Sequence, residues 1–283
     1  MRYKLTHVVP AALGLAFAGL LASANWASAA RGITVKGSDT MVILGQRWAE
    51  DYMNSHPGSV IQVTGGGSGT GIAALINGTT DICQASRPMK EDEKRKLRDR
   101  FQTMGIEIPV AKDGLSIYLN EANPVRQLSI EQLRNIYTGA ATNWKQVGGN
   151  DARITLYGRE NSSGTYVYFK DNVLLGRDYS ASMQTLPGTA AVVNAVAKDP
   201  NGIGYGGAAY AKGVRDCGVK KDEKSSAVLP SAQTVQDGSY PITRYLYFYT
   251  RLRPAGEMKK FVDWVLSSDG QALATKVGYF PVR

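Results

Sequence analysis

The sequence predicts an α/β protein, because strand-like runs alternate with helix-like runs along the first hundred residues. The strand-like runs cover 33–36, 60–63 and 81–85. Each run leads into a polar turn and then into apolar residues at helical spacing. This alternation is typical of a parallel sheet with helices on both faces, in which the loops at the carboxyl ends of the strands converge on one crevice. We therefore expect a ligand to bind at these loops.

The first 29 residues have the composition of a secretory signal peptide. Arg2 and Lys4 form a short basic segment, residues 8–21 are largely apolar, and 27–29 (Ala-Ser-Ala) fit a cleavage site. The apolar run is shorter than the roughly 18 residues typical of a membrane span, and a retained membrane anchor is the alternative. Neither cysteine lies near the cleavage site, so no lipid attachment point is expected. We expect an exported protein, in the periplasm or secreted.

The net charge of the sequence is +9, and it is +7 without the two basic residues of the expected signal peptide. A positive balance is compatible with nucleic acid or with a small anion. The densest charged run, 90–100, mixes acidic with basic residues and therefore predicts a solvated helix face. We expect a small anionic ligand, no nucleic acid partner and a monomer.

The residue types that most enzymes need are scarce. Cys83 and Cys217 are the only cysteines. Export permits a disulfide. However, they are far apart in the sequence and fall in different lobes of the layout given below, so we expect none and expect Cys83 to be a buried thiol. His56 is the only histidine after the expected signal peptide, and it precedes a proline at a predicted helix end. Two thiols and one histidine provide neither a usual zinc site nor a triad base. We expect no metal, no cofactor and no catalytic residue.

Two glycine-rich segments match nucleotide-binding motifs only in part. Residues 65–71 lack the lysine of a Walker A loop, and Thr70 stands where a dinucleotide fingerprint or a nucleophile elbow needs glycine. Residues 202–207 match the dinucleotide spacing, but no convincing strand precedes them, and we expect a glycine-rich turn there. Nucleotide binding is therefore not expected.

The clearest candidate site is the segment 159–165 (Arg-Glu-Asn-Ser-Ser-Gly-Thr), which follows a strand-like run at 154–157 and precedes a helix-like run. Unpaired first-turn amides and the helix dipole favour an anion at such a helix start. Arg159 adds a rigid fork of donors. An ordinary helix cap by Ser162 or Ser163 is the alternative.

Hydroxyl side chains of the same kind follow other predicted strands. They are Ser38, Thr40, Ser68, Thr70, Ser86, Ser163 and Thr165, with Arg87 and Arg159 as nearby charges. A tetrahedral oxyanion has four oxygens, and each must be paired when the anion is taken out of water. Neutral donors that arrive from several turns meet this requirement. The pattern predicts a site for a small tetrahedral anion, with a set of unrelated caps and turns as the alternative.

The second part of the chain contains further strand and helix patterns. Residues 106–110 and 115–119 are two strand-like runs about 112–114 (Lys-Asp-Gly). Residues 245–249 are strongly strand-like, and 258–277 have the pattern of a closing helix.

At these motifs the sequence resembles the phosphate-binding proteins that serve ABC-type phosphate importers. The resemblance covers about residues 32–283. The segments that carry it are 37–40 (Gly-Ser-Asp-Thr), 67–71 (Gly-Ser-Gly-Thr-Gly), 81–82 (Asp-Ile) leading to 86–87 (Ser-Arg), Arg159 with 163–165 (Ser-Gly-Thr), and 202–205 (Gly-Ile-Gly-Tyr). Each segment alone is a weak signal, whereas the ordered set is specific.

The resemblance implies a two-lobed clamshell of the periplasmic-binding-protein class (type II-like), with a mixed sheet flanked by helices in each lobe. Lobe 1 would comprise 30–112 and 245–283, and lobe 2 would comprise 113–244. The lobes would close by a hinge motion about the strands that cross between them, near 112–113 and 243–244. Inorganic phosphate would be bound between the lobes and delivered to the membrane permease of an ABC importer.

Carried over position by position, the resemblance implies a set of phosphate contacts. These are the Thr40 hydroxyl, the Met41 amide, Ser68, the Ser86 turn, Arg159, Ser163, Gly164 and Thr165. Ser38 and Arg87 join them as phosphate-binding candidates because of the hydroxyl and charge pattern described above.

One position departs from the family pattern. Many family members have an aspartate where this chain has Ser86, and that carboxylate accepts a hydrogen bond from protonated phosphate. A carboxylate there rejects sulfate, because two unpaired anions would be buried together. Selectivity between phosphate and sulfate therefore stays open, and a sulfate receptor or an exported phosphate sensor or scavenger is an alternative. The alternative from another functional class, the enzymes, is an exported hydrolase of phosphate esters.

Overall fold

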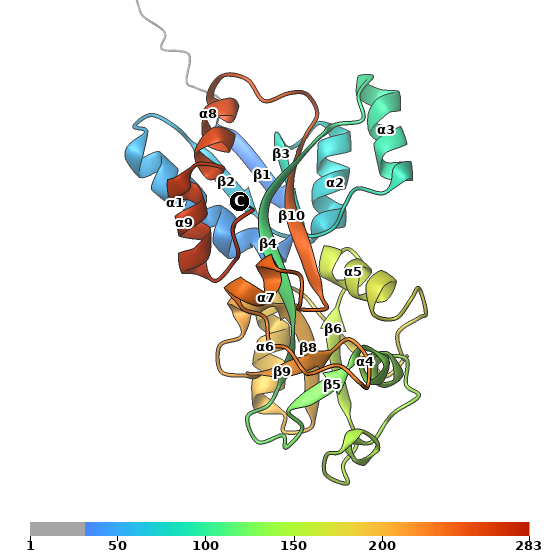
Figure 1. Cartoon of the computed structure of the whole chain (residues 1–283). Coiled ribbons are helices and arrows are strands. Elements are labelled where there is room, and N and C mark those ends of the chain that lie inside the picture. Colours follow the sequence, from blue (N-terminus) through green and yellow to red (C-terminus); the bar gives the residue numbers. More distant parts are fainter. Residues whose placement is uncertain (1–31, 283) are drawn as a thin grey trace, which may run out of the picture. The chain divides into compact units, whose positions relative to one another are not determined.

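The computed structural model of the protein describes residues 32–282 (Figure 1). The expected signal peptide, 1–29, lies outside the described residues. The described residues form ten strands, which are β1 (Ile33–Gly37), β2 (Ile61–Thr64), β3 (Ile82–Ala85), β4 (Ile106–Leu119), β5 (Gln127–Ser129), β6 (Thr155–Arg159), β7 (Gln184–Leu186), β8 (Gly202–Gly207), β9 (Arg215–Lys220) and β10 (Thr243–Thr250). They also form nine α-helices, which are α1 (Val42–Ser55), α2 (Ser68–Asn77), α3 (Glu91–Phe101), α4 (Ile130–Tyr137), α5 (Gly164–Asn172), α6 (Thr189–Lys198), α7 (Ala232–Gln236), α8 (Gly256–Val265) and α9 (Ser268–Val277). Three short 3-10 segments are η1 (Asp39–Met41), η2 (Trp144–Val147) and η3 (Ala208–Tyr210).

The strands form one mixed sheet in the order β2-β1-β3-β10-β4-β8-β6-β7, with β9 paired to β4 and β5 paired to β9. β1 is parallel to β2 and β3, and β6 is parallel to β7 and β8. β10 is antiparallel to β3 and β4, and β4 is antiparallel to β8. The predicted alternation of strands and helices is confirmed. Within the described part, no helix is both long and apolar enough for a membrane crossing.

β4 and β10 lie side by side and connect two groups of elements (Figure 1). One group contains β1–β3 with α1–α3, α8 and α9, and the other contains β5–β9 with α4–α7. The prediction of two separate runs about 112–114 is wrong, because β4 continues through these residues. The backbone of Asp113 and Gly114 pairs with Arg244 and Thr243 of β10. The polar Asp113 looks like a strand break in the sequence, but its side chain is buried against Arg244.

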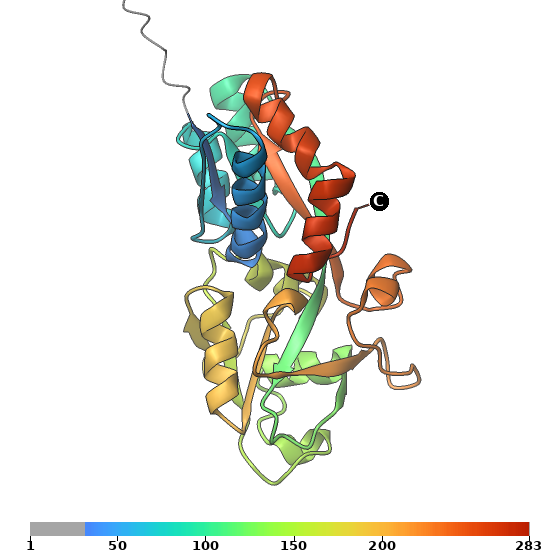
Figure 2. The same cartoon turned by 90° about the vertical axis from the view of Figure 1, so that its left-hand side faces the viewer.

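The glycine-rich turn predicted at 202–207 is instead the buried strand β8. α6 lies along this strand (Figure 2). A β-carbon on Gly204 would lie 2.7 Å from a methyl group of Val192 and 2.9 Å from one of Val196. Glycine is therefore needed for the helix to approach the strand so closely. The glycines also remove the alternating side chains by which a strand is recognised in a sequence.

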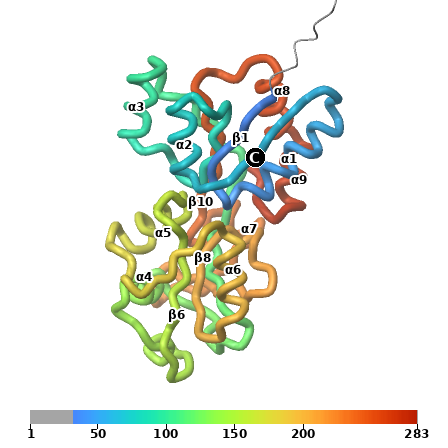
Figure 3. Tube along the Cα trace, turned by 180° about the vertical axis from the view of Figure 1, so that it is seen from behind, coloured from blue at the N-terminus to red at the C-terminus, as the bar shows by residue number. Residues whose placement is uncertain are grey.

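Helices cover both faces of the sheet formed by β1, β3 and β10 (Figures 1 and 3). α1, α8 and α9 pack together on one face, where Trp48, Phe248 and Phe261 belong to one buried cluster. α2 and α3 cover the other face, where Leu75 and Leu97 belong to a second cluster. Burial on both faces holds the loops at the carboxyl ends of these strands on a rigid support.

α5 is anchored in the second group of elements by Phe169. This ring stacks on Tyr205 with centroids 4.2 Å apart, and it meets Tyr137 edge-on at 4.9 Å. All three side chains are fully buried, and aromatic pairs of this kind each add about 0.5–1.5 kcal/mol beyond the area that they bury. Since Phe169 follows the start of α5 by little more than one turn, this packing fixes where the helix begins.

Candidate functional site

Six of the ten residues predicted to bind an anion are brought together in one buried set of hydroxyl side chains. They are Ser38, Thr40, Ser68, Ser86, Ser163 and Thr165, and we call them the hydroxyl cluster. None of them is more than 2% exposed. They come from the chain segments that follow β1, β2, β3 and β6. Loops that are distant in the sequence therefore meet at one place in the fold.

Three serines of the cluster are in mutual contact. The Ser38 hydroxyl donates to Ser86 Oγ at 2.9 Å, and Ser68 Oγ lies 3.3 Å from the same atom. The Ser86 amide donates to Ser68 Oγ at 3.0 Å. Three loops after three neighbouring strands thus place their hydroxyl oxygens within hydrogen-bond distance of one another.

The first turn of α5 faces these serines from the other group of elements. Thr165 Oγ1 lies 2.8 Å from Thr40 Oγ1. The Gly69 amide donates to the Ser162 carbonyl at 2.9 Å. A β-carbon on Gly164 would lie 2.7 Å from a hydroxyl oxygen of the facing serines, so no side chain fits there. The α5 turn and the loops after β1, β2 and β3 therefore touch across the cluster.

The helix cap that the sequence offered as the alternative interpretation of this turn is present, and Ser163 is the capping residue. Ser163 Oγ accepts hydrogen bonds from the amides of Thr165 and Tyr166, at 3.2 and 3.3 Å. β6 ends at Arg159, and α5 begins at Gly164. The positive end of the α5 dipole thus lies at the cluster, where it favours negative charge.

The glycine-rich segment before α2 allows its close approach to the α5 turn. Gly67 has a φ of +90°, and a β-carbon there would lie 2.6 Å from the Ser162 carbonyl oxygen. Thr70 takes no part in the cluster, because it is exposed and its hydroxyl donates to the Gly66 carbonyl at 2.6 Å. Gly67 is thus explained by packing between the two groups of elements.

The loop after β1 forms η1 before α1 begins. The Met41 amide, a predicted phosphate donor, gives its hydrogen bond to the Ser38 carbonyl at 3.0 Å, and the Met41 side chain is fully buried. The Tyr279 hydroxyl donates to the Thr40 carbonyl. Met41 therefore lies beside the cluster with its amide paired inside its own turn.

Arg159 is 1% exposed and shares its guanidinium among three side chains. It donates to both Glu160 oxygens at 3.2 Å, to Thr189 Oγ1 at 2.9 Å and to Asp39 Oδ2 at 2.7 Å. The other Asp39 oxygen accepts from the Gly66 amide at 2.7 Å. The Arg159–Asp39 ion pair joins the end of β6 to the loop after β1. No pattern in the sequence assigns this role to Asp39, although it lies within the Gly-Ser-Asp-Thr segment.

Arg87 is not brought into the cluster. Its two terminal nitrogens donate to the two Glu93 oxygens at 2.8 and 2.7 Å, and one of them also donates to the Pro88 carbonyl at 2.9 Å. Glu93 lies in the first turn of α3 and also accepts from the Lys90 amide at 2.7 Å. Arg87 therefore holds the start of α3.

A second arginine, which the sequence did not identify as a site residue, reaches the cluster instead. Arg244 donates to the Ser86 carbonyl at 3.1 Å and to Thr165 Oγ1 at 3.0 Å. It also donates to Asp113 Oδ2 from Nε and from a terminal nitrogen, at 3.0 and 2.7 Å. Burial raises the pKa of the Asp113 carboxyl above its usual range, and the Arg244 charge opposes that shift. The only hint in the sequence was that both residues fall in the expected crossing strands.

What the arrangement supplies chemically is a set of fixed hydrogen-bond donors. Hydroxyls from two groups of elements and a capped helix start meet in one cluster, Arg244 contacts it, and Arg159 is paired with Asp39, which lies between two cluster residues in the sequence. Such a combination of donors suits an oxyanion. His56, by contrast, ends α1 and stacks on Tyr52 with centroids 4.0 Å apart. It makes no contact with the hydroxyl cluster.

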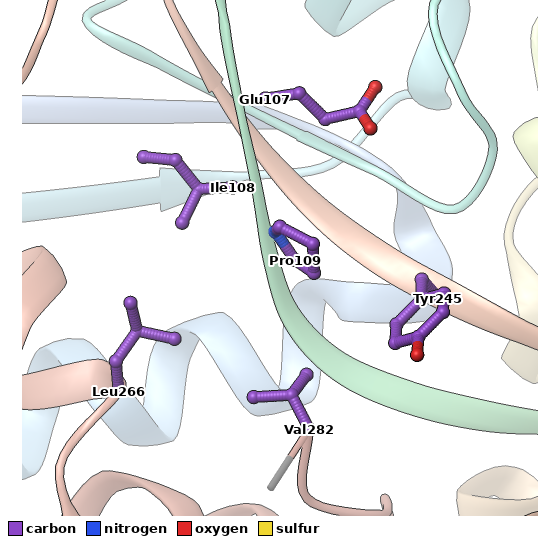
Figure 4. A pocket seen from close by; sticks show the side chains of 6 residues that line it. All are labelled: Glu107, Ile108, Pro109, Tyr245, Leu266 and Val282. Carbon is purple, nitrogen blue, oxygen red and sulfur yellow. The ribbon is translucent and has the colours of Figure 1, made fainter.

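A surface pocket elsewhere contains none of the predicted binding residues (Figure 4). It lies beside β4 and β10, and its lining residues are Glu107, Ile108, Pro109, Tyr245, Leu266 and Val282. Most of these side chains are apolar, so the pocket lacks the donors that an anion requires.

The sequence matches the family model of the PBP superfamily domain over residues 22–269. It is 33% identical over 263 residues to the phosphate-binding protein PstS of Pseudomonas aeruginosa, with 87% of this chain and 81% of that protein covered. It is 34% identical over 253 residues to the PstS protein of Staphylococcus haemolyticus, with 86% and 79% covered.

Solved structures show the same likeness. A Clostridium perfringens protein assigned as the substrate-binding protein of a phosphate ABC transporter, solved with bound phosphate, superposes with a TM-score of 0.81. It is 28% identical, and the superposition covers 89% of this chain and 100% of that chain. An ABC-type phosphate transport receptor from Vibrio cholerae has a TM-score of 0.70 and is 30% identical, with 88% and 99% covered. The predicted two-lobed α/β fold is thereby confirmed.

Proposed function

The chain belongs to the PBP superfamily, and we propose that it is an exported receptor that captures inorganic phosphate and delivers it to the permease of an ABC importer. The observation that carries this proposal is the hydroxyl cluster, which is buried and is built from both groups of elements. A small dianion taken out of water needs a partner for every oxygen. The relatives described above bind phosphate according to their names, and this chain covers most of their length.

We propose that the two groups of elements are the lobes of the receptor, with boundaries at 112/113 and 244/245. Lobe 1 then comprises 30–112 with 245–283, and lobe 2 comprises 113–244. Two large buried clusters support this division, since residues of one lie in 33–111 and 246–279 and most of the other lie in 115–242. Closure by bending of β4 and β10 brings the α5 turn against the serines of lobe 1.

The proposed phosphate ligands are the hydroxyl cluster, the Gly164 turn and Arg159, with the Met41 amide at the edge of the site. Arg87 is left out, because Glu93 holds its guanidinium. The binding role involves no bond making or breaking, so we propose that the protein is not an enzyme. A phosphatase assay with added divalent metal tests the rival hydrolase, for which phosphate release above a blank is the supporting result.

The proposal is tested by calorimetric titration of the mature protein with inorganic phosphate and, separately, with sulfate. We expect saturable binding of one phosphate per chain. A permease partner is tested by phosphate uptake into membrane vesicles that contain the permease of an ABC phosphate importer, and uptake that requires this protein is the expected result. Absence of heat with phosphate would overturn the proposed function.

The side chain at position 86 is expected to set the preference between phosphate and sulfate. Ser86 Oγ is fully buried between Ser38 and Ser68, and a hydroxyl can donate to either anion. We expect Ser86→Asp to weaken sulfate binding at least about tenfold relative to phosphate, because only phosphate has a proton to share with a buried carboxylate. Competition titrations of the two anions measure the ratio, and Ser86→Asn is the uncharged control. An unchanged ratio in Ser86→Asp contradicts the expectation.

A further inference from the structure

Arg244 and Asp113 form a buried ion pair next to the hydroxyl cluster, on the two strands that cross between the groups of elements. They face each other in the register of β4 and β10, and they are 5% and 1% exposed. Two guanidinium nitrogens donate to the same Asp113 oxygen. A carboxylate that holds a planar guanidinium in this way also fixes the directions of its remaining donors.

The remaining donors of Arg244 contact residues from both proposed lobes. One terminal nitrogen donates to the Ser86 carbonyl at 3.1 Å, and the other donates to Thr165 Oγ1 at 3.0 Å. Ser86 follows β3, and Thr165 lies in the first turn of α5. The guanidinium carbon lies over the Tyr168 ring, 5.3 Å from the ring centroid, and the ring restricts its movement.

The contact with Thr165 determines how this hydroxyl bonds. Arg244 has only donors, so Thr165 Oγ1 must accept from it. The single hydroxyl proton of Thr165 then points elsewhere, toward the neighbouring Thr40 oxygen or toward a ligand oxygen in the cluster. An anion needs donors, and a hydroxyl whose lone pair is already held by Arg244 loses less rotational freedom when its proton binds the anion.

We propose that Arg244 is a positioning residue of the anion site, which fixes the Thr165 hydroxyl as a donor toward phosphate and is itself oriented by Asp113. The inference rests on the proposed function of the hydroxyl cluster. Because Asp113 balances the charge of Arg244, the pair acts through the direction of the Thr165 hydrogen bond more than through net charge. The two terminal nitrogens of Arg244 also connect Ser86 of lobe 1 to Thr165 of lobe 2.

The test is a double-mutant cycle on phosphate affinity, measured by calorimetry with inorganic phosphate. We expect Arg244→Gln to weaken binding about tenfold, and Arg244→Lys to recover part of the loss, since lysine keeps a donor but not the planar fork. Thr165→Val also weakens binding. In the Thr165→Val background, Arg244→Gln is expected to change the affinity by less than about twofold, because the hydroxyl that it orients is gone.

A merely structural role of Arg244 gives a different result. The loss from Arg244→Gln would then be equally large with and without the Thr165 hydroxyl, and this outcome overturns the inference. An unchanged phosphate affinity in Arg244→Gln alone also overturns the inference. Since Arg244→Gln leaves Asp113 buried without its partner, the variant Asp113→Asn/Arg244→Gln provides an uncharged pair. This double variant is expected to unfold close to the wild-type temperature and to show the same loss of phosphate affinity as Arg244→Gln.

Arg251→Gln is the matched control. Arg251 follows β10 directly, donates to the Thr80 carbonyl and lies over the Phe101 ring at 5.5 Å, with no contact to the hydroxyl cluster. Its replacement is expected to leave phosphate affinity unchanged. If the wild-type protein gives no phosphate binding, the proposed function falls and this inference falls with it. If the wild-type protein binds phosphate but the effects of Arg244→Gln and Thr165→Val simply add, only the inference about Arg244 is overturned.

Discussion

Replacement of Gly164 by alanine is expected to weaken phosphate binding about hundredfold while the protein without ligand remains as stable as the wild type. A β-carbon at this position would lie 2.7 Å from Ser86 Oγ and 2.9 Å from Ser68 Cβ, both closer than van der Waals contact. The two serines belong to the opposite group of elements, so the clash arises only when the groups are together. Gly164 has no positive φ, and alanine therefore suits the first turn of α5 without strain.

Calorimetric titration measures the affinity of Gly164→Ala, and thermal unfolding without phosphate measures its stability. Ala190→Ser is the matched control, since it also adds one heavy atom to the first turn of a helix, α6, at an exposed position. We expect the control to bind phosphate as the wild type does. If Gly164→Ala binds with wild-type affinity, the α5 turn and the serines do not approach each other in the phosphate complex.

Arg159→Ala is expected to weaken phosphate binding by a similar factor, for an electrostatic reason. The guanidinium is 1% exposed and pairs with Asp39 and Glu160. Its removal leaves both carboxylates without a cationic partner beside the cluster, where they repel an anion. The lost pair also joins the loop after β1 to the end of β6, so the contact between the two groups of elements weakens as well. A loss of about 2.8 kcal/mol corresponds to a factor of about a hundred.

The measurement is again phosphate affinity, here at two ionic strengths. Arg47→Ala is the control, because Arg47 makes a single ion pair to Glu50 and about half of its side chain is exposed. We expect no change of affinity in the control. An affinity of Arg159→Ala within threefold of the wild type would place the anion away from this arginine.

The residues of the hydroxyl cluster could be predicted because each obeys a local rule. Ser163 is followed by a helix and caps it, as its position between a strand pattern and a helix pattern indicates. Ser38, Ser68 and Ser86 each follow a short strand, and neighbouring parallel strands carry their loops to the same edge of the sheet. Local patterns and sheet topology together were sufficient for these positions.

The two arginines near Ser86 show where local rules fail. Arg87 is adjacent in the sequence, but Glu93 lies six positions later on α3 and captures its guanidinium. Arg244 is 158 positions away from Ser86, and it arrives because β10 is inserted between β3 and β4. Which strands pair across such distances is decided by the packing of the whole sheet, which no short segment of sequence encodes.

The position of β10 also governs the order in which the molecule can be completed. β3 and β4 are both hydrogen-bonded to β10 and not to each other, and β10 begins only at Thr243. Until that strand is available, β3 and β4 each have an unpaired edge, and Arg244 is absent from beside Ser86. During synthesis, which begins at the N-terminus, the chain can thus form β5–β9 and their helices before the first group of elements is complete. The proposed anion site is therefore completed last, with the final forty or so residues, although most of its hydroxyl side chains are synthesised early.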